Sequence, residues 1–293
     1  MALPASAPGC RLGRCVAGRA VRRLAEHLCE FDREVGMHGP GAGIRWMLPQ
    51  LAVAHGSSGA EQVPRTGPLI IAANHPGAFD AAVILAHVPR ADYKIVIGDI
   101  PPYRSLPHVS RHVIFSPGSG NPSGRTHTVR HAVRHLSDGG ALLIFPRGGI
   151  EPDPAVMDGA DVDFGRWSRS LETFLKRVPR AQVVVTMVSG VVAERSLRHP
   201  VTWLCRRAAD RQRLATLYQS LRQVYAGREL YGLTPHVTFG EALAEIAPEC
   251  IRSEVERAAR QVLAQHLTII RRHDPVLRTQ LDHQHTAPPV GSY

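Results

Sequence analysis

The chain lacks the features that define several large classes of protein. Its five cysteines are scattered and none has C-x-x-C spacing, so neither a zinc site nor a disulfide framework is expected. No apolar run approaches the ~20 residues of a membrane-spanning helix. The longest run, residues 183–193, is rich in β-branched side chains and predicts a core strand. The first 23 residues contain no apolar segment typical of a secretory signal. These absences favour a cytoplasmic protein, either soluble or bound to a membrane surface.

Lysine is also scarce, so the positive charge of the chain is almost entirely arginine. All but two of the 35 Lys and Arg side chains are Arg, and the formal net charge is +10. Arginine suits phosphate and carboxylate through its planar fork, although codon usage alone can produce the same bias. The charge predicts attraction to an anionic partner, which could be a lipid surface, a phosphorylated substrate or a nucleic acid.

Strand and helix patterns alternate through the middle of the chain. We expect strands at Pro68–Ala73, Tyr93–Ile97, Arg111–Phe115, Ala141–Phe145, Gln182–Val192 and His236–Phe239. We expect helices at 17–35, Asp80–Val88, Thr126–Ser137, Ser168–Arg177, within 203–230, and at Ala247–His273. This order predicts an α/β sandwich around a mostly parallel central sheet flanked by helices. The predicted division is a disordered start (1–16) with a helical extension to residue 44, a domain over 45–245, and a C-terminal helix with a loose tail over 246–293.

The helix expected over 17–35 is basic and amphipathic. Its apolar stripe is formed by Val21, Leu24, Leu28 and Phe31, with arginines elsewhere on the helix. Such a helix can lie on a membrane, or its apolar stripe can pack against the rest of its own domain. Packing is the preferred interpretation, and membrane contact stays open.

The stretch "IIAANHPGAFDAAVI" (70–84) places a histidine and a carboxylate at the end of an apolar strand. The strand delivers Asn74 and His75 to the carboxyl edge of the sheet, where open α/β folds bind ligands. The Pro76–Gly77 turn then brings Asp80, at the start of the next helix, back toward the imidazole. A carboxylate on Nδ1 leaves Nε2 able to accept a proton. The pair can therefore form a general base, or be a turn histidine beside a helix-capping aspartate.

A second apolar strand leads into a similar loop, "GGALLIFPRGGIEPDP" (139–154). Backbone amides in such a Gly-rich turn can bind an anion, and Arg147 can pair with phosphate. An ordinary exit from a strand is the alternative interpretation.

Together the two stretches resemble the phospholipid/glycerol acyltransferase family, which includes the lysophosphatidic acid acyltransferases. "NHPGAFD" is similar to the family's His-four residues-Asp motif, and "FPRG" (145–148) to its Phe-Pro-Glu-Gly motif. The late segment "HVTFGEAL" (236–243) is similar to the end of the family's domain, and the resemblance spans about 45–245. It implies transfer of an acyl group from a thioester of coenzyme A or acyl carrier protein to a lipid hydroxyl, with His75 as base and Asp80 as its orienting partner.

This chain departs from the family pattern at two places. Arg147 stands where the family has Glu, and Glu151 is the candidate substitute. A further family motif, which lies between the two motifs above, usually carries an Arg for the acceptor phosphate. The matching stretch here, "HVIFSPGSGNPSGR" (112–125), lacks an Arg at that place, and only Arg111 and Arg125 flank it. A variant lysolipid is therefore as credible an acceptor as lysophosphatidic acid. The substrate-binding candidates are Asn74, Gly77, Phe145, Pro146, Arg147, Gly148, Glu151, Arg111 and Arg125.

The remaining expectations follow from this reading. No cofactor or metal is expected beyond the acyl-CoA or acyl carrier protein co-substrate, and the helix carrying His127, His131 and His135 is interpreted as a solvated basic face rather than a metal site. The expected partners are the acyl donor, a lysolipid acceptor and an anionic membrane surface, with no nucleic acid. The expected location is peripheral, on the inner face of the cell membrane. The alternatives are a basic membrane- or RNA-binding protein with a degenerate site, and a thioester hydrolase.

Overall fold

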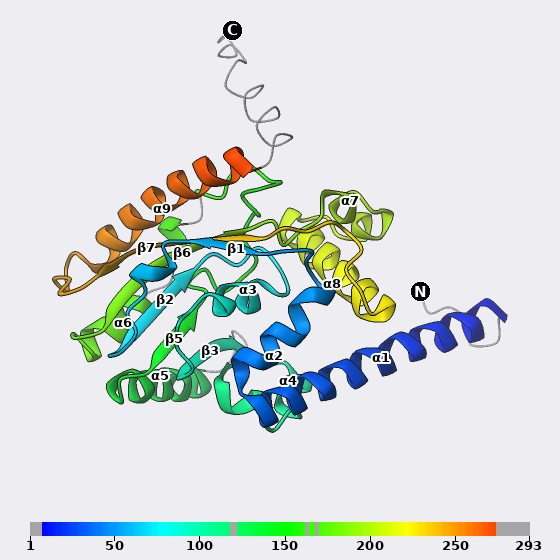
Figure 1. Ribbon diagram of the computed structural model, residues 1–293, viewed down its shortest axis with the longest axis horizontal. Helices are drawn as coiled ribbons and strands as arrows, with labels where there is room; N and C mark the ends of the chain where they lie inside the picture. The colour runs from blue at the N-terminus through cyan, green and yellow to red at the C-terminus, as the bar shows by residue number, and fades with distance from the viewer. Residues whose placement is uncertain (1–7, 118–121, 162–163, 168–169, 274–293) are drawn as a thin grey trace, which may run out of the picture.

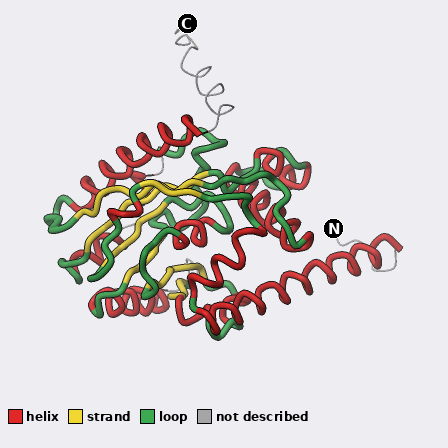
Figure 2. The backbone as a smooth tube through the Cα atoms, viewed as in Figure 1, coloured by secondary structure: helices red, strands yellow, loops and turns green. Residues whose placement is uncertain are grey.

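The computed structural model describes residues 8–117, 122–161, 164–167 and 170–273. One seven-stranded sheet lies between helices (Figure 1, Figure 2). The strands are β1 (Gly56–Ser58), β2 (Leu69–Ala73), β3 (Tyr93–Gly98), β4 (Val113–Ser116), β5 (Ala141–Ile144), β6 (Gln182–Ser189) and β7 (His236–Leu243). The α-helices are α1 (Pro8–His38), α2 (Pro40–Met47), α3 (Asp80–Ala86), α4 (Pro101–Arg104), α5 (Pro122–Ser137), α6 (Ser170–Arg177), α7 (Glu194–Leu197), α8 (Ala208–Ala226) and α9 (Ile251–His273).

The strand order is β1-β7-β6-β2-β5-β3-β4, which places β2 at the centre. Every pair is parallel except β6 and β7, so the predicted mostly parallel α/β sandwich is confirmed. Because the strands adjoining β2 run parallel to it, the loops that follow β2, β5 and β6 emerge at one edge of the sheet. We call this edge the carboxyl edge. In the chain, α3 follows β2, and α7 and α8 follow β6 (Figure 1).

The two faces of β2 are buried in separate hydrophobic clusters. Ile71 and Ala73 pack with residues of α2 and α3, whereas Ile70 and Ala72 pack with α5, α6 and α9. All five residues of β2 are buried, which is why the strand is a continuous apolar run instead of an alternating one. A rigid central strand therefore ends where the histidine motif begins.

Several boundaries differ from the predicted ones. The strand predicted to reach Val192 ends at Ser189, because Gly190 adopts a φ of 73° and leaves the extended conformation. Helix α1 begins at Pro8, before the predicted start at residue 17, while residues 1–7 and the tail from 274 lie outside the described residues. The short strand β1 was missed, since "GSS" has no apolar pattern.

The C-terminal half of α1 packs against the rest of the protein, as preferred from the sequence. Asp32 Oδ1 accepts hydrogen bonds from the backbone nitrogens of His108 (2.9 Å) and Val109 (2.8 Å). Arg23 Nη1 donates to the Tyr225 carbonyl at 2.7 Å, which joins α1 to the end of α8. The N-terminal half projects from the body of the molecule (Figure 1). None of the described helices is both long enough and apolar enough to cross a bilayer.

Candidate active site

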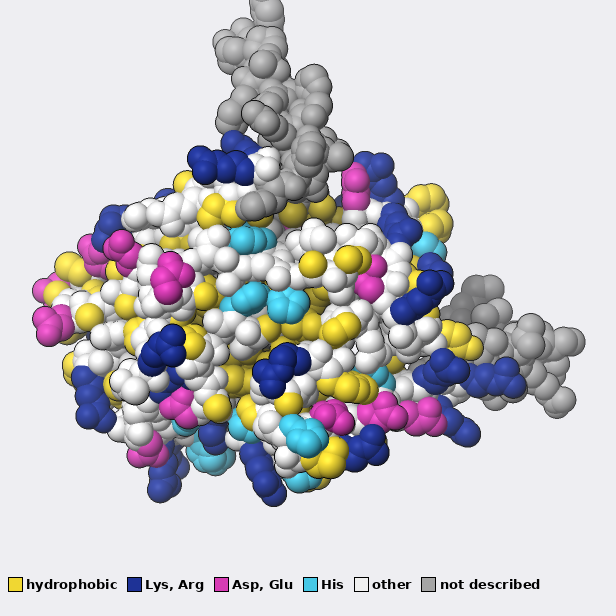
Figure 3. All heavy atoms as spheres, viewed as in Figure 1, with side chains coloured by type: hydrophobic (Ala, Val, Ile, Leu, Met, Phe, Trp, Pro, Cys, Tyr) yellow, Lys and Arg dark blue, Asp and Glu magenta, His cyan; other side chains and the backbone are white. Residues whose placement is uncertain are grey.

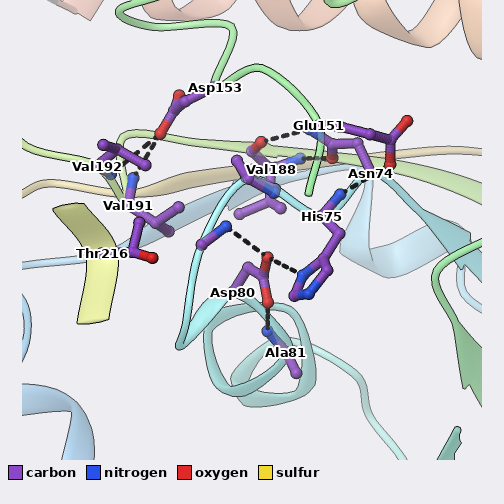
Figure 4. Close-up of polar contacts among 12 residues, drawn as sticks. Asn74, His75, Asp80, Ala81, Glu151, Asp153, Val188, Val191, Val192 and Thr216 are labelled. Carbon is purple, nitrogen blue, oxygen red and sulfur yellow. Dashed lines mark hydrogen bonds and ion pairs between the residues drawn. The ribbon is translucent and has the colours of Figure 1, made fainter. Parts of the chain in front are cut away.

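His75 and Asp80 form a hydrogen-bonded pair at the carboxyl edge. Asp80 Oδ2 lies 2.7 Å from His75 Nδ1 and accepts a second bond from the Gly77 backbone nitrogen at 3.0 Å (Figure 4). Its other oxygen, Oδ1, accepts from the Ala81 nitrogen at 2.7 Å. The Asp80 side chain is 2% exposed and the His75 side chain 29%. The two carboxylate oxygens thus accept three bonds, which hold Asp80 in a single orientation against the imidazole.

The partner on Nδ1 determines what the other ring nitrogen of His75 can do. An Nδ1–H that donates to a carboxylate leaves Nε2 as the proton acceptor. Nε2 makes no hydrogen bond to the described residues. Burial is the largest effect on the pKa of His75 and lowers it, but the charge and hydrogen bond of Asp80, together with the charge of Glu151, outweigh burial and raise the pKa above its usual 6.5. The pair has the geometry of an oriented base.

The loop after β5 lies beside His75, as the resemblance of residues 145–148 to the family's Phe-Pro-Glu-Gly motif predicts. β5 is the parallel neighbour of β2, and Ile144 is paired with Ala72. The Phe145 ring stacks on the His75 ring, with centroids 4.4 Å apart and planes 26° apart. A turn closed by a 3.0 Å bond from the Gly148 nitrogen to the Phe145 carbonyl follows, with Pro146 buried, Arg147 half-buried and Gly148 exposed at a φ of 68°. Arg147 therefore lies at the same sheet edge as His75.

Glu151 holds the backbone of His75 in place. Its Oε2 accepts from the His75 backbone nitrogen at 3.0 Å, and its own backbone nitrogen donates to the His75 carbonyl at 2.9 Å. Its Oε1 accepts from Trp167 Nε1 at 2.9 Å, and the side chain is buried. The structure thus places this carboxylate against the histidine, but on its main chain.

Asn74 and Gly77 serve the shape of the loop. The Asn74 amide exchanges two hydrogen bonds with the backbone of Val188 on β6, at 2.9 and 2.8 Å, so both of its polar atoms are engaged within the protein. A Cβ on Gly77 would lie 2.8 Å from the Val191 side chain. Only glycine fits there without movement of the loop after β6.

Three buried polar side chains that the sequence reading missed connect the loops of the carboxyl edge. Gln212 of α8 donates to the carbonyls of Pro76 (2.8 Å) and Glu151 (2.7 Å). Gln219, about two turns further along the same face of α8, accepts from the backbone nitrogen of residue 193 and donates to the carbonyl of residue 191. Asp153 accepts from the backbone nitrogens of residues 155, 190, 191 and 192, at 3.0–3.1 Å. Glutamines at positions 212, 219 and 223 share one face of the helix, and that spacing was the signal available in the sequence.

Arg111 does not lie with the other candidates. It belongs to a short 3₁₀ helix that precedes β4, so it sits at the amino edge of a parallel strand, opposite His75. Arg125 lies in the first turns of α5, on the carboxyl side, but β4 is three strands away from β2, or about 14 Å. The prediction that Arg111 lies near the site was wrong.

The structure adds a cation that the sequence did not suggest. Arg213 follows Gln212 on α8, its side chain is 63% exposed, and its charge acts on the His75 ring to lower its pKa. Its nearest anionic partner is Asp210, at 3.7 Å. A positive side chain is therefore present near enough to the base to act on its charge.

The three spaced histidines do not form one cluster. The rings of His127 and His131 lie 4.2 Å apart, but His135 Nε2 is bonded to the Ala141 carbonyl at 2.9 Å. Among the residues that the structure describes, no group of three or more His, Cys, Asp or Glu side chains is arranged to hold a metal ion.

Comparison with known proteins places this site in a family. Residues 56–176, from β1 to α6 and including both motifs, match the family model "Acyltransferase". These residues match the acyltransferase family, which supports the family predicted from the motifs. Among solved structures, the chain is similar to the crystal structure of the 1-acyl-sn-glycerophosphate (LPA) acyltransferase PlsC from Thermotoga maritima, with a TM-score of 0.46 and 16% identity over 83% of this chain and 80% of that one. None of the curated proteins compared with the chain matches it.

Proposed function

We propose that this acyltransferase moves an acyl group from a thioester of coenzyme A or acyl carrier protein to the hydroxyl of a lysophospholipid or glycerol-phosphate-type acceptor. The observation that carries the proposal is the Asp80-bound His75, whose Nε2 is available at the carboxyl edge within an acyltransferase-family domain. The glycerolipid class of acceptor rests on the resemblance of the two motifs. An intact pair gives no support to a degenerate binding protein.

In the proposed reaction, His75 Nε2 takes the proton of the acceptor hydroxyl as its oxygen attacks the thioester carbon. The carbonyl π electrons move onto oxygen, and the Asp80 carboxylate stabilises the imidazolium. When the carbon–sulfur bond breaks, the thiolate leaves and receives the proton from His75. The products are an ester and a free thiol, so the histidine returns to its starting state.

The oxyanion of this reaction needs hydrogen-bond donors. The turn beside His75 offers the backbone of residues 76–78, and two of these three positions are unsuitable. Pro76 has no N–H, and the Gly77 nitrogen is already bonded to Asp80. The Ala78 amide is the remaining candidate, on an exposed residue beside the pair.

An anionic acceptor needs a cation near the base, and two arginines meet this need. Arg147 follows the Phe145 ring that stacks on His75, and Arg213 lies on the helix that holds the His75 loop. Both positions are compatible with a phosphate on the acceptor, since guanidinium binds phosphate through paired hydrogen bonds. Arg147 remains our first candidate because it stands within the segment that resembles the family's Phe-Pro-Glu-Gly motif, in place of the Glu.

We also propose that the protein works at the surface of an anionic membrane, on its inner face. The lipid nature of the proposed acceptor and the net charge of +10 support this location. The exposed arginines Arg19 and Arg22 on α1 can contribute to attraction without a spanning helix.

The test is to incubate the purified protein with labelled acyl-CoA or acyl carrier protein and a panel of lysolipids, and to identify the product. An esterified lipid that forms with wild type and not with His75→Ala supports the proposal. Release of free fatty acid at the same rate with and without acceptor would identify a thioester hydrolase instead. The exposed His127→Ala is the matched control.

A further inference from the structure

A rigid hydrophobic tip projects from the loop between α7 and α8. Trp203 is 73% exposed and Leu204 is 81% exposed. Among the described residues they are the only two exposed large hydrophobic side chains that are adjacent in sequence. We call Trp203 and Leu204 the apolar tip. Isolated exposed hydrophobics are ordinary, but an adjacent Trp–Leu pair with this exposure is not explained by the packing of the domain.

The turn that carries the apolar tip is held in place by a buried side chain and hydrogen bonds. It is a 3₁₀ helix, Pro200–Leu204, in which Thr202 is completely buried. The Thr202 hydroxyl lies within hydrogen-bond distance of two carbonyl oxygens, Leu197 at 2.9 Å and His199 at 2.8 Å. The His199 ring stacks on Tyr218 of α8 and bonds its hydroxyl at 3.0 Å. The inward threonine therefore fixes the turn, and the two apolar side chains are held outward before any partner binds.

The surroundings of the apolar tip are strongly basic. Residues 195–213 contain six arginines and one acidic residue, Asp210. Arg206 and Arg207 follow the tip after Cys205 and are exposed, as is Arg211 one turn later. Figure 3 shows hydrophobic side chains next to basic ones at the end of the molecule where α7 lies. An apolar tip followed by exposed arginines matches the interface of an anionic bilayer, where indole rings reside at the headgroup level.

The apolar tip also lies at the same sheet edge as the base. It follows β6, a parallel neighbour of β2, so it emerges at the carboxyl edge. Leu204 lies eight residues before Gln212, which bonds the Pro76 carbonyl beside His75. Four residues of chain and one turn of α8 cannot separate Leu204 from Gln212 by more than about 20 Å.

We infer that the apolar tip inserts into the headgroup region of an anionic lipid bilayer and holds the carboxyl edge against it. The arginines at 206, 207 and 211 then face lipid phosphates, and a lysolipid acceptor meets His75 without leaving the membrane surface. The inference rests on the proposed function for its choice of lipid over other anionic surfaces. It locates membrane contact on the loop before α8, apart from the basic helix α1.

The experiment measures binding to vesicles of equimolar phosphatidylcholine and phosphatidylglycerol, without any acyl donor. Leu204→Glu is expected to weaken binding at least tenfold, and Arg207→Gln roughly fivefold. The matched control Val53→Glu adds the same charge at another exposed hydrophobic position and is expected to bind as wild type does. Unchanged thermal melting of each variant verifies that it folds.

Intrinsic fluorescence gives a second readout that needs no destabilising change. The other two tryptophans, Trp46 and Trp167, are half-buried and buried, so brominated lipid should quench mainly Trp203. Trp203→Phe should keep most of the binding and lose most of the quenching. Wild-type quenching that persists in Trp203→Phe would overturn the inference.

Other outcomes are equally decisive. The inference is wrong if Leu204→Glu binds like wild type, if Val53→Glu weakens binding as much, or if only Val21→Glu on α1 abolishes it. It is also wrong if the wild-type protein does not bind the vesicles. Conversion of a dimer to a monomer by Leu204→Glu would likewise overturn it, since the tip would then contact a second copy of the chain. Acyl transfer to a short-chain, water-soluble acceptor tests the proposed function separately and should be unchanged in Leu204→Glu.

Discussion

The carboxylate of Glu151 lies 3.0 Å from the backbone nitrogen of His75, while the Glu151 backbone nitrogen lies 2.9 Å from the His75 carbonyl. A loop 76 residues further along the chain thereby clamps both sides of one peptide segment. The clamp holds the residue that carries the imidazole, whereas Asp80 holds the imidazole itself. Position and orientation of the proposed base are thus set by two different carboxylates.

Replacing Glu151 by Gln should disturb this clamp more than its small chemical change suggests. The carboxylate accepts from His75 N and Trp167 Nε1, and an amide has only one acceptor oxygen, so one buried donor loses its partner. The loss should reduce the free energy of unfolding by about 1–3 kcal/mol. We expect kcat to fall with little change in donor KM, measured by steady-state kinetics and chemical denaturation.

A double variant separates the clamp from simple destabilisation. Trp167→Phe removes the second donor, so Glu151→Gln/Trp167→Phe can turn its oxygen toward His75 and recover kcat relative to Glu151→Gln. The exposed Glu241→Gln serves as control. Equal kcat in the single and double variants would contradict the proposed role of the second donor.

Activity should depend on pH through His75, with a sign set by its partners. A base acts only when neutral, and the pKa of His75 is raised above 6.5 by Asp80 and Glu151 despite the opposing effect of burial. We therefore expect kcat/KM to rise with pH through an apparent pKa above 6.5. His75→Ala should lower kcat by about 10²–10⁴-fold.

Asp80→Asn should shift this profile to lower pH. The variant loses the charge that favours imidazolium but keeps the burial that disfavours it, so the apparent pKa should fall. Its kcat should also fall, because one amide oxygen cannot accept the three bonds that Asp80 accepts. A profile with an unchanged midpoint would show that Asp80 does not act on the catalytic group.

Burial of Asp153 should make stability depend on pH. Burial raises the pKa of this carboxyl to about 6, against the opposing effect of four backbone amides. Since the folded-state pKa lies above the unfolded value of 3.8, the folded state holds the proton over a range where the unfolded state has lost it. This contribution to stability is complete below about pH 4 and is lost as the pH rises to about 6.

Asp153→Asn should remove that dependence, and the exposed Asp138→Asn should not. The measurement is the free energy of unfolding of each protein between pH 4 and pH 7. Relative to Asp153→Asn, wild type should lose stability across this range. The opposite trend would show that the four amides outweigh burial.

The sequence predicted what local chain direction determines. The continuous apolar run of β2 identified a central strand, and five residues with one Pro–Gly turn sufficed to pair His75 with Asp80. Arg111 was misplaced although the information was present, since it opens the expected strand and therefore belongs to the opposite edge. Direction within a parallel sheet is readable from the sequence alone.

The supports of the site could not be read in the same way. Asn74 bonds Val188 because β6 lies beside β2, and Gln212 bonds Pro76 because α8 crosses the carboxyl edge. Both contacts join residues more than 100 positions apart, and local patterns carry no information on which strands become neighbours. A helix was expected within 203–230, but the sequence did not show that one glutamine-bearing face of this helix is buried against the carboxyl edge.

Arg147 should contact the anionic group of the acceptor. In the alternative interpretation, Arg147 pairs with a nearby carboxylate and only shapes its loop. Because the Asp153 oxygens already accept from four backbone amides, Glu151 is the carboxylate to consider as its partner. Arg147→Lys keeps the charge and loses the paired hydrogen bonds of the guanidinium. We expect the KM for an anionic lysolipid to rise about tenfold, the effect of one charge-assisted hydrogen bond, with the donor KM unchanged.

Steady-state kinetics with each substrate varied in turn measures both constants, and three variants make the result interpretable. Arg134→Lys, on the exposed face of α5, controls for the substitution itself. Arg213→Gln tests the second cation of the edge, and a rise in acceptor KM there with none in Arg147→Ala would move the contact to α8. Loss of thermal stability in Arg147→Lys, with both KM values altered alike, would mean that Arg147 shapes the loop and does not touch the acceptor.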